Sequence, residues 1–261
     1  MALQNETIQT LQQAFDKILV VSVPRFTERH ARIRKHLQGL HFDFFWGADK
    51  LKLDYEDVKT DGTYDEPRAK KLQRQGKALN LGEIACSLSH RNLYAAMVEN
   101  GWQKVLVLED DALPLPENMP ALPAALAQLP GDWELVYLGY LKHEEVTAGL
   151  KVKQFFYKIM SALGLMTWTY TMVSNLLPKR YSEHLKKAGF HDCTHAYALT
   201  LPAAKKLLAK QTPVVYRADD LLSATILQGE LKAFVTDPKF FDQEMFHNAA
   251  IASEIKENNQ Q

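Results

Sequence analysis

Short, β-branched apolar runs alternate along this chain with stretches in which apolar residues recur at helical spacing. Residues 18–23 form the first apolar run, Pro24 closes it, and a basic, helix-like stretch follows at 28–40. A strand, a break and a helix suggest the opening of a βαβ unit, which residues 41–46 would extend with a second strand. Residues 51–77 are charged and contain turn-forming breakers, so we expect a surface loop with one helical turn there.

Residues 81–100 carry the clearest helical pattern in the chain. Apolar side chains recur there at helical spacing and form one wide face. Asn80 is placed to cap the helix, Glu83 three positions later completes a capping box, and Gly101 supplies the stop. Residues 104–108 follow as a run that is apolar on both faces, which is typical of a central parallel strand.

The second half of the chain predicts further strands and helices. In chain order these are a strand at 133–138 closed by Gly139, a strand at 196–201, helices at 202–209 and 219–227, and a short strand at 231–235. The whole pattern predicts an α/β fold. We interpret residues 1–17 as an N-terminal helical leader, 18–255 as a single domain and 256–261 as a frayed tail.

Composition and charge narrow the classes of function. Of the 261 residues, 46% are apolar and 24% charged, which argues against wholesale disorder. The formal net charge is zero, so we do not expect nucleic acid as a partner. Cys86 and Cys193 have no metal-ligand spacing and are expected to be reduced thiols. Residues 1–17 lack the pattern of a secretory signal, so we expect a cytoplasmic protein.

Three acidic residues, Glu109, Asp110 and Asp111, follow the predicted central strand directly. Ligands of open α/β sheets bind at the carboxyl ends of the strands, where adjacent carboxylates do not all ionise cheaply without a cation. Mg²⁺ and Mn²⁺ prefer oxygen ligands and neutralise charge on a departing diphosphate. The triplet therefore predicts a Mn²⁺ or Mg²⁺ site. The alternative is that the three acids cap a helix after the strand and face water.

Two motifs surround this triplet: Gly-Glu-Ile-Ala-Cys-Ser-Leu-Ser-His at 82–90 and Val-Leu-Val-Leu-Glu-Asp-Asp at 105–111. Together they resemble glycosyltransferase family 25, whose pattern is a Gly-Glu-x-x-Cys-x-x-Ser-His helix before a strand that ends in Glu-Asp-Asp. Further segments agree in order, namely 18–25 with Arg29, 133–139, 196–208 and 218–222, so the resemblance spans residues 18–255. Ala85 stands where the family often has Gly, and residues 141–190 match no family motif.

The family includes lipopolysaccharide and lipooligosaccharide galactosyl- and glucosyltransferases and the collagen galactosyltransferases. The resemblance implies a GT-A-like fold, with a Rossmann-type mixed sheet flanked by helices. It also implies inverting transfer of a hexose, galactose favoured and glucose next, from a UDP-sugar to a lipooligosaccharide or lipopolysaccharide glycan. The acceptor would be a glycolipid or an oligosaccharide. A metal-dependent nucleotidyltransferase or phosphohydrolase, and a non-catalytic, membrane-docked protein that binds nucleotide sugars, are the alternatives.

The acidic triplet carries the candidate metal ligands. Asp110 and Asp111 are the expected ligands, and Glu109 and Asp110 are also expected to contact the donor. His247 is a further candidate ligand, although a lone histidine is more often a surface or core residue.

An inverting transfer also needs a base that takes the proton of the acceptor hydroxyl. Asp219 or Asp220 is our candidate, and Glu83 is a second one. The alternative for each of the three is capping of a helix. Asp219 and Asp220 are successive residues, so both do not easily point into one pocket.

Five more residues are candidates for contacts with the donor. Arg25 and Arg29 follow the first predicted strand, with solvated surface charge as the alternative. Asp49 is placed to bind the base or the ribose. Ser89 and His90 lie on the long predicted helix, where they either contact phosphate and position the triplet or simply pack in the core. As adjacent helical residues they diverge by about 100°, so they do not form a nucleophile pair.

Residues 141–190 form an apolar and basic insert. Its stretch 155–177 contains a single charge, Lys158, and basic residues flank it on both sides. The length is near the roughly 20 residues of a membrane span, but hydroxyl side chains and a glycine interrupt it. Peripheral membrane contact through residues 151–187, at the inner face of the cytoplasmic membrane, fits this pattern better than a span. The alternative is a helical lid over the sheet, and both interpretations can hold.

Overall fold

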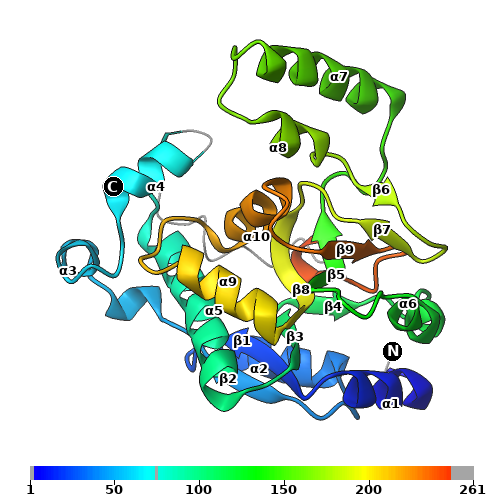
Figure 1. The fold of residues 1–261 in the computed structure, drawn as a ribbon. Coiled ribbons are helices and arrows are strands. Elements are labelled where there is room, and N and C mark those ends of the chain that lie inside the picture. Colours follow the sequence, from blue (N-terminus) through cyan, green and yellow to red (C-terminus); the bar gives the residue numbers. More distant parts are fainter. Residues whose placement is uncertain (1–2, 74–75, 248–261) are drawn as a thin grey trace.

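The computed structural model of the chain describes residues 3–73 and 76–247 and builds them around a mixed, eight-stranded sheet (Figure 1). Across the sheet the strands are β2 (Asp43–Trp46), β1 (Lys17–Ser22), β3 (Lys104–Glu109), β8 (Asp192–Thr200), β5 (Leu135–Leu141), β9 (Ala233–Thr236), β7 (Leu185–Lys187) and β6 (Lys179–Arg180). β1 is parallel to β2 and β3, whereas β8 runs antiparallel between β3 and β5. The predicted α/β fold with a mixed sheet is confirmed.

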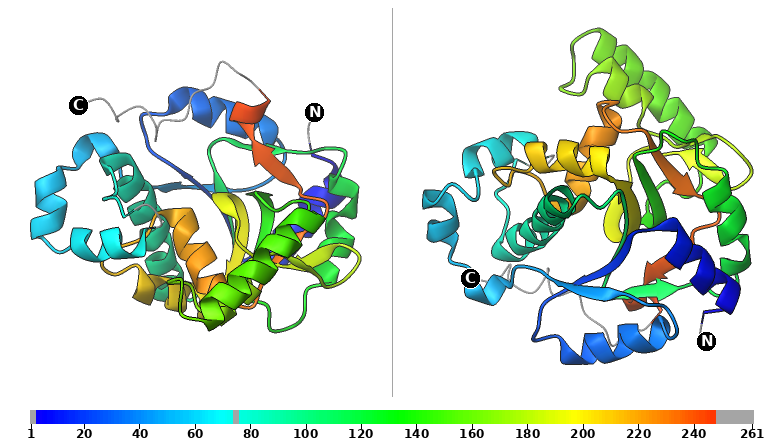
Figure 2. Two further views of the ribbon diagram at one scale, coloured as in Figure 1. Left: turned by 90° about the horizontal axis from the view of Figure 1, so that it is seen from above. Right: turned by 60° about the horizontal axis from the view of Figure 1, so that its bottom comes forward.

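Helices cover both faces of this sheet because successive side chains of a strand point to opposite faces. One face packs against α1 (Asn5–Ala14), α2 (Thr27–His36) and α6 (Leu122–Ala127), and the other against α5 (Leu81–Asn100), α9 (Leu201–Lys210) and α10 (Ala218–Leu227). Figure 2 shows the sheet between these two layers. Along β3, Leu106 and Leu108 belong to the first core, and Val105 and Val107 belong to the second.

Smaller elements complete the fold. A two-stranded sheet joins β4 (Ala112–Pro114) to β10 (Phe241–Gln243), and the short 3-10 helices are η2 (Met119–Ala121) and η3 (Glu244–Phe246). Within the predicted leader, α1 forms a helix, and Leu11 of α1 and Phe15 are buried in the first core. The predicted tail at 256–261 lies outside the described residues.

Helix α5 begins at the predicted capping box. Asn80 Oδ1 accepts the Glu83 N–H at 2.9 Å, and Glu83 Oε2 accepts the Asn80 N–H at 2.9 Å. Gly101 ends the helix in the left-handed conformation, with a φ of 68°. Both predicted ends of the long helix are confirmed, and so is the opening βαβ unit, which β1, α2 and β2 form.

The prediction of a loop at residues 51–77 is wrong. The structure has the 3-10 helix η1 (Lys50–Lys52) and the helices α3 (Tyr55–Thr60) and α4 (Glu66–Leu72) in this part of the chain. The Asp54 carboxylate accepts N–H groups of α3 and the Asp65 carboxylate accepts one of α4, so both short helices are capped. Val58 and Tyr64 bury against α5 and hold them in place.

The prediction that this strand closes at Gly139 is wrong, because β5 continues to Leu141. A Cβ atom at Gly139 would lie 2.3 Å from His195 Nε2 and 2.7 Å from the Phe241 carbonyl oxygen. Glycine therefore lets β8 and β10 approach β5 closely, and the β5–β8 register shifts on both sides of this residue.

The first part of the insert at residues 141–190 is helical, as predicted, whereas its second part contributes β6 and β7 to the sheet. Its two helices are α7 (Ala148–Ala162) and α8 (Tyr170–Ser174), which lie together beyond α10 and β6 (Figure 1). Gln154 Nε2 donates to the Val173 carbonyl oxygen at 2.8 Å and ties α7 to α8. No side chain of α7 is buried by the described residues, and Phe155 and Phe156 are 60% and 57% exposed. No helix in the described part of the chain is long and apolar enough to span a bilayer.

The close approach at Gly139 is testable by substitution. Gly139→Ala should lower the free energy of unfolding by about 1–3 kcal/mol, because the added methyl group overpacks the junction of three strands. Gly131→Ala is the matched control, since a Cβ atom there meets nothing within 4 Å, and it should stay within about 0.5 kcal/mol. Urea unfolding of both variants measures the difference, and equal stabilities would contradict the packing described here.

Candidate functional site

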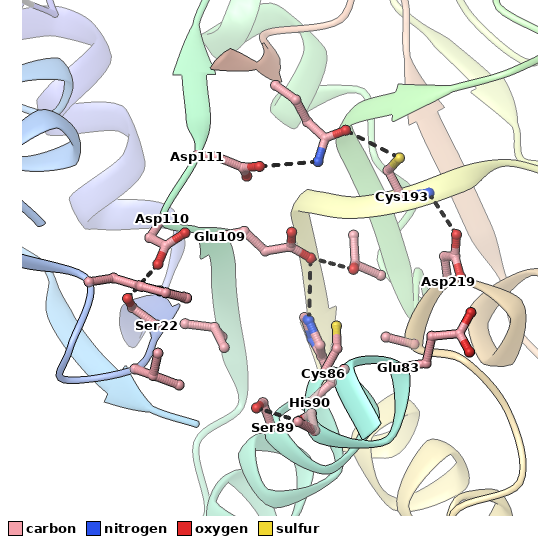
Figure 3. A pocket seen from close by; sticks show the side chains of 18 of the residues that line it. Ser22, Glu83, Cys86, Ser89, His90, Glu109, Asp110, Asp111, Cys193 and Asp219 are labelled. Carbon is pink, nitrogen blue, oxygen red and sulfur yellow. Dashed lines mark hydrogen bonds and ion pairs between the residues drawn. The ribbon is translucent and has the colours of Figure 1, made fainter. Parts of the chain in front are cut away.

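A cavity of about 460 Å³ opens at the carboxyl ends of β1, β2 and β3. The first turns of α5 and α10 and the start of β8 complete its walls (Figure 3). Val21 of β1 lies opposite Glu109 of β3, so residues remote in sequence end side by side.

Asp110 is buried, and both of its carboxylate oxygens have partners. Ser22 Oγ donates to Oδ2 at 2.5 Å, and Arg29 Nη1 donates to Oδ1 at 2.6 Å. Burial raises the pKa of Asp110 above its ordinary value, although the Arg29 charge and the Ser22 hydroxyl oppose this shift. Arg29 is thus a largely buried partner of the triplet and not a solvated surface charge.

Glu109 is held by its neighbours in a different way. Thr194 Oγ1 donates to Glu109 Oε1 at 2.5 Å, and His90 Nε2 lies 3.4 Å from the same oxygen (Figure 3). Burial acts to raise the pKa of Glu109, but the His90 ring and the Thr194 hydroxyl outweigh it and leave the pKa below its ordinary value. Behind this contact, His90 Nδ1 lies 2.8 Å from the Tyr197 hydroxyl.

Asp111 is the least satisfied member of the triplet. Its Oδ1 atom is buried and makes no hydrogen bond with any described residue, and Oδ2 accepts one long bond, 3.4 Å, from Gln243 Nε2. Burial, with the charges of Glu109 and Asp110, raises the pKa of Asp111 from 3.8 to about 7. The chain continues into β4 and not into a helix, so the alternative that the triplet caps a helix is wrong.

Ser89 fixes the loop after β2 against α5. Its hydroxyl donates to the Ala85 carbonyl oxygen at 2.7 Å and accepts the Ala48 N–H at 3.0 Å. A Cβ atom at Gly47 would lie 2.3 Å from Ser89 Oγ, so glycine allows the loop to come this close. Ser89 therefore positions one wall of the cavity.

Arg25 and Asp49 face each other in that wall. Arg25 Nε lies 3.1 Å from both carboxylate oxygens of Asp49, and its guanidinium group lies 4.2 Å from the centre of the Phe26 ring. Asp49 Oδ1 also accepts the Leu51 N–H at 3.1 Å, which caps η1. The pair is thus anchored at the end of β1.

Asp219 lies across the cavity from the triplet, in the first turn of α10 (Figure 3). Its Oδ2 accepts the Cys193 N–H at 3.2 Å, and its Oδ1 accepts the Asp220 N–H at 2.9 Å. Cys193 adopts a φ of 73°, a left-handed conformation that costs a non-glycine residue about 1–3 kcal/mol. Burial and the Asp220 charge raise the pKa of Asp219, while Arg217 opposes the shift.

Asp220 and Glu83 are engaged differently from Asp219. The Asp220 carboxylate pairs with Arg217 Nε at 2.7 Å and is not among the described residues that line the cavity. Arg217 occupies the N-cap position of α10, so neither Asp219 nor Asp220 caps that helix. Glu83 does cap α5 and also lines the cavity, with one oxygen 4.0 Å from Arg217 Nη1.

Most of the predicted site residues meet in this one cavity. Those that line it are Arg25, Arg29, Asp49, Glu83, Ser89, His90, Glu109, Asp110, Asp111 and Asp219. His247 is not among the described lining residues, and its Nε2 atom lies 3.1 Å from Asp242 Oδ2. Sequence reasoning missed the lining residues Ser22, Cys86, Cys193, Thr194 and Gln243. Cys86 could have been found, because it precedes His90 by one helical turn and shares its face.

A family model covers most of the segments that build this cavity. The model described as "Glycosyltransferase family 25 (LPS biosynthesis protein)" matches residues 15–222. The chain belongs to glycosyltransferase family 25. The matched range contains the acidic triplet, both arginines and Asp219.

Three curated relatives illustrate the range of this family. A glycosyltransferase 25 family member of Anopheles gambiae is 30% identical over 203 residues, which cover 74% of this chain and 28% of that protein. A probable inactive family member 3 of Bos taurus is 25% identical over 214 residues, 77% of this chain and 30% of that one. Procollagen galactosyltransferase 1 of Danio rerio is 27% identical over 141 residues, 50% and 22% of the two chains. This family 25 chain thus spans less than a third of each relative.

The burial of Asp111 predicts how stability depends on pH. Its folded-state pKa lies above the unfolded value, so the folded state binds the extra proton and stability falls as pH rises from about 4 towards 7. In the presence of chelator, Asp111→Asn should therefore raise the thermal unfolding midpoint at about pH 8 and leave it nearly unchanged at about pH 4. Asp132→Asn is the control, because its pKa is lowered by Lys232 and its loss should not stabilise. A destabilised Asp111→Asn protein at high pH would contradict this account.

Proposed function

We propose that this chain is an inverting glycosyltransferase that moves a hexose from a UDP-sugar to a glycolipid or oligosaccharide acceptor of the lipooligosaccharide or lipopolysaccharide type. Galactose is the favoured sugar and glucose the next. The description of the family model, LPS biosynthesis protein, supports the acceptor class, and the zebrafish relative named as a galactosyltransferase supports galactose. One observation carries the proposal: the acidic triplet and Asp219 line opposite walls of one cavity.

The carboxylates fit a hard divalent cation, Mn²⁺ or Mg²⁺. Asp111 presents a buried oxygen with no hydrogen bond from any described residue, and its pKa is raised to about 7 by burial and by its acidic neighbours. Asp111 would hold the ion, with Asp110 beside it. Such an ion, when bound, neutralises charge on the leaving diphosphate.

Asp219 is the base in this proposal. Its two backbone hydrogen bonds fix the carboxylate in the cavity wall, and its raised pKa suits a group that must accept a proton. The acceptor hydroxyl gives its proton to Asp219 as its oxygen attacks the anomeric carbon and the bond to the diphosphate breaks. The Asp220 carboxylate pairs with Arg217, and the Glu83 carboxylate caps α5. Asp220 and Glu83 are therefore the second and third candidates for the base.

The wall opposite Asp219 would receive the donor nucleotide. Arg25 and Asp49 lie there as an anchored pair, with Ser89 supporting the loop that carries Asp49. Arg29 supports Asp110, and His90 supports Glu109, so both would act on the donor through the triplet.

We also propose that the protein is cytoplasmic and touches the inner face of the cytoplasmic membrane through residues 151–187. α7 exposes Phe155, Phe156 and Ile159 to solvent and carries Lys151, Lys153 and Lys158. Apolar side chains with lysines on one helix favour an anionic lipid surface, because the rings enter the acyl boundary while the ammonium groups meet the headgroups.

The transfer reaction is tested by the release of UDP from a panel of UDP-sugars, with Mn²⁺ and with chelator. Release from one preferred donor should require the metal and increase with a glycolipid acceptor. Asp219→Asn should lower kcat by about 100-fold or more because the base is lost, whereas the adjacent Asp220→Asn should stay within a few-fold. Asp111→Ala should abolish release without loss of helical circular dichroism.

The same assay separates the other functions. Release without preference for a sugar would favour a nucleotidyltransferase or phosphohydrolase. Binding of UDP-sugars without any release would favour a non-catalytic protein. The bovine relative, which is named as probably inactive, is the reason to test this alternative. Near-normal turnover by Asp219→Asn would overturn the assignment of the base.

Membrane contact is tested by co-sedimentation with lipid vesicles. The wild-type protein should bind vesicles that contain phosphatidylglycerol more strongly than neutral ones. Phe155→Ser combined with Phe156→Ser should lower the partition coefficient at least tenfold, because each fully buried ring contributes about 1.5–3 kcal/mol. Leu51→Ser is the control, since Leu51 is an exposed apolar residue outside the insert. Equal binding by the double variant would contradict a role for α7.

A further inference from the structure

Three side chains of different chemistry meet at the floor of the cavity. A sulfur, an imidazole nitrogen and a carboxylate oxygen, from Cys86, His90 and Glu109, all lie within 4.8 Å of one another. Cys86 and His90 are one turn apart on α5 and so share a face, and Glu109 reaches them from the end of β3. Figure 3 shows the three side chains directed towards one point.

The His90 ring supplies a second, independent indication of a ligand. The residue is 2% exposed, and its Nε2 atom makes no hydrogen bond with any described residue, although Glu109 Oε1 lies 3.4 Å away. Its other nitrogen, Nδ1, lies 2.8 Å from the Tyr197 hydroxyl, which in turn lies 3.1 Å from the Tyr94 hydroxyl. A histidine that binds a metal through Nε2 donates its Nδ1–H to such a partner, which fixes the tautomer and the ring.

The ligand set differs in chemistry from the oxygen ligands around Asp111. Thiolate, imidazole and carboxylate together are ligands of Zn²⁺ and similar borderline ions, whereas Mg²⁺ is bound through oxygen. Three protein ligands leave a fourth position open, as in zinc sites that admit water or a substrate. All three residues line the cavity, so an ion can reach them from solvent.

We propose that Cys86, His90 and Glu109 form a second metal site, selective for Zn²⁺ and related thiophilic divalent ions, at the floor of the cavity. Binding replaces the proton of the Cys86 thiol, which leaves to solvent. The ion would neutralise the Glu109 charge beside Asp111. The site stands on these three residues alone and does not require the proposed transfer reaction to be correct.

Cobalt is a suitable probe, because a bond between Co²⁺ and a thiolate produces a charge-transfer band in the near ultraviolet. Titration of the full chain with Co²⁺ should produce this band, and added Zn²⁺ should remove it. Cys86→Ser should lose the band and weaken Zn²⁺ binding at least tenfold. Cys193→Ser is the matched control, because Cys193 lines the same cavity but lies outside the cluster, and it should keep the band.

Two further results decide the proposal. Asp111→Asn should keep the cobalt band even if it loses transferase activity, since Asp111 is not one of the three ligands. Absence of the band in the wild-type protein, or its equal loss in Cys86→Ser and Cys193→Ser, would overturn the site. Loss of the band in Asp111→Asn would also overturn it, because the three residues would then not hold the ion without Asp111. Circular dichroism of each variant checks that it is folded.

Discussion

The cavity depends on the electrostatic cost of placing three consecutive carboxylates at the end of a buried strand. The protein supplies partners for two of these carboxylates. Arg29 and a serine hydroxyl engage both oxygens of Asp110, and a histidine and a threonine hold Glu109. Asp111 retains the electrostatic cost. Burial and the charges of Glu109 and Asp110 raise its pKa, and one of its oxygens has no hydrogen-bond partner among the described residues. An external cation is the group that would relieve it.

This arrangement requires segments from distant parts of the chain to be held rigidly. The parallel register of β1 and β3 brings Ser22 beside Asp110, and β8 returns antiparallel to bring Thr194 beside Glu109. The left-handed Cys193 turns its N–H towards Asp219 on α10, a strain that the surrounding sheet sustains. Two glycines permit further close approaches: Gly47 lets Ser89 reach the loop after β2, and Gly139 lets β8 and β10 pack against β5.

Local signals explain what could be predicted from the sequence. The capping box, the long helix and the apolar strand before the triplet are encoded by residues a few positions apart, and all three are present. Sequence reasoning missed the helices at 55–72 because their charged composition suggested a loop. They form because Asp54 and Asp65 cap them and because they pack against α5. The choice between Asp219 and Asp220 depends on the tertiary position of Cys193, and no sequence pattern contains that information.

The insert is coupled to the cavity through its two ends. The insert follows β5, which ends at Leu141, and precedes β8, which begins at Asp192, and both residues line the cavity. Lys142 and Asp192 form an ion pair that joins the two ends of the insert. A surface that binds the exposed face of α7 would therefore be held near the mouth of the cavity. In the proposed transfer reaction, a lipid-linked acceptor presented by that surface would reach Asp219 with little loss of orientational freedom, since the protein and the acceptor would share one plane.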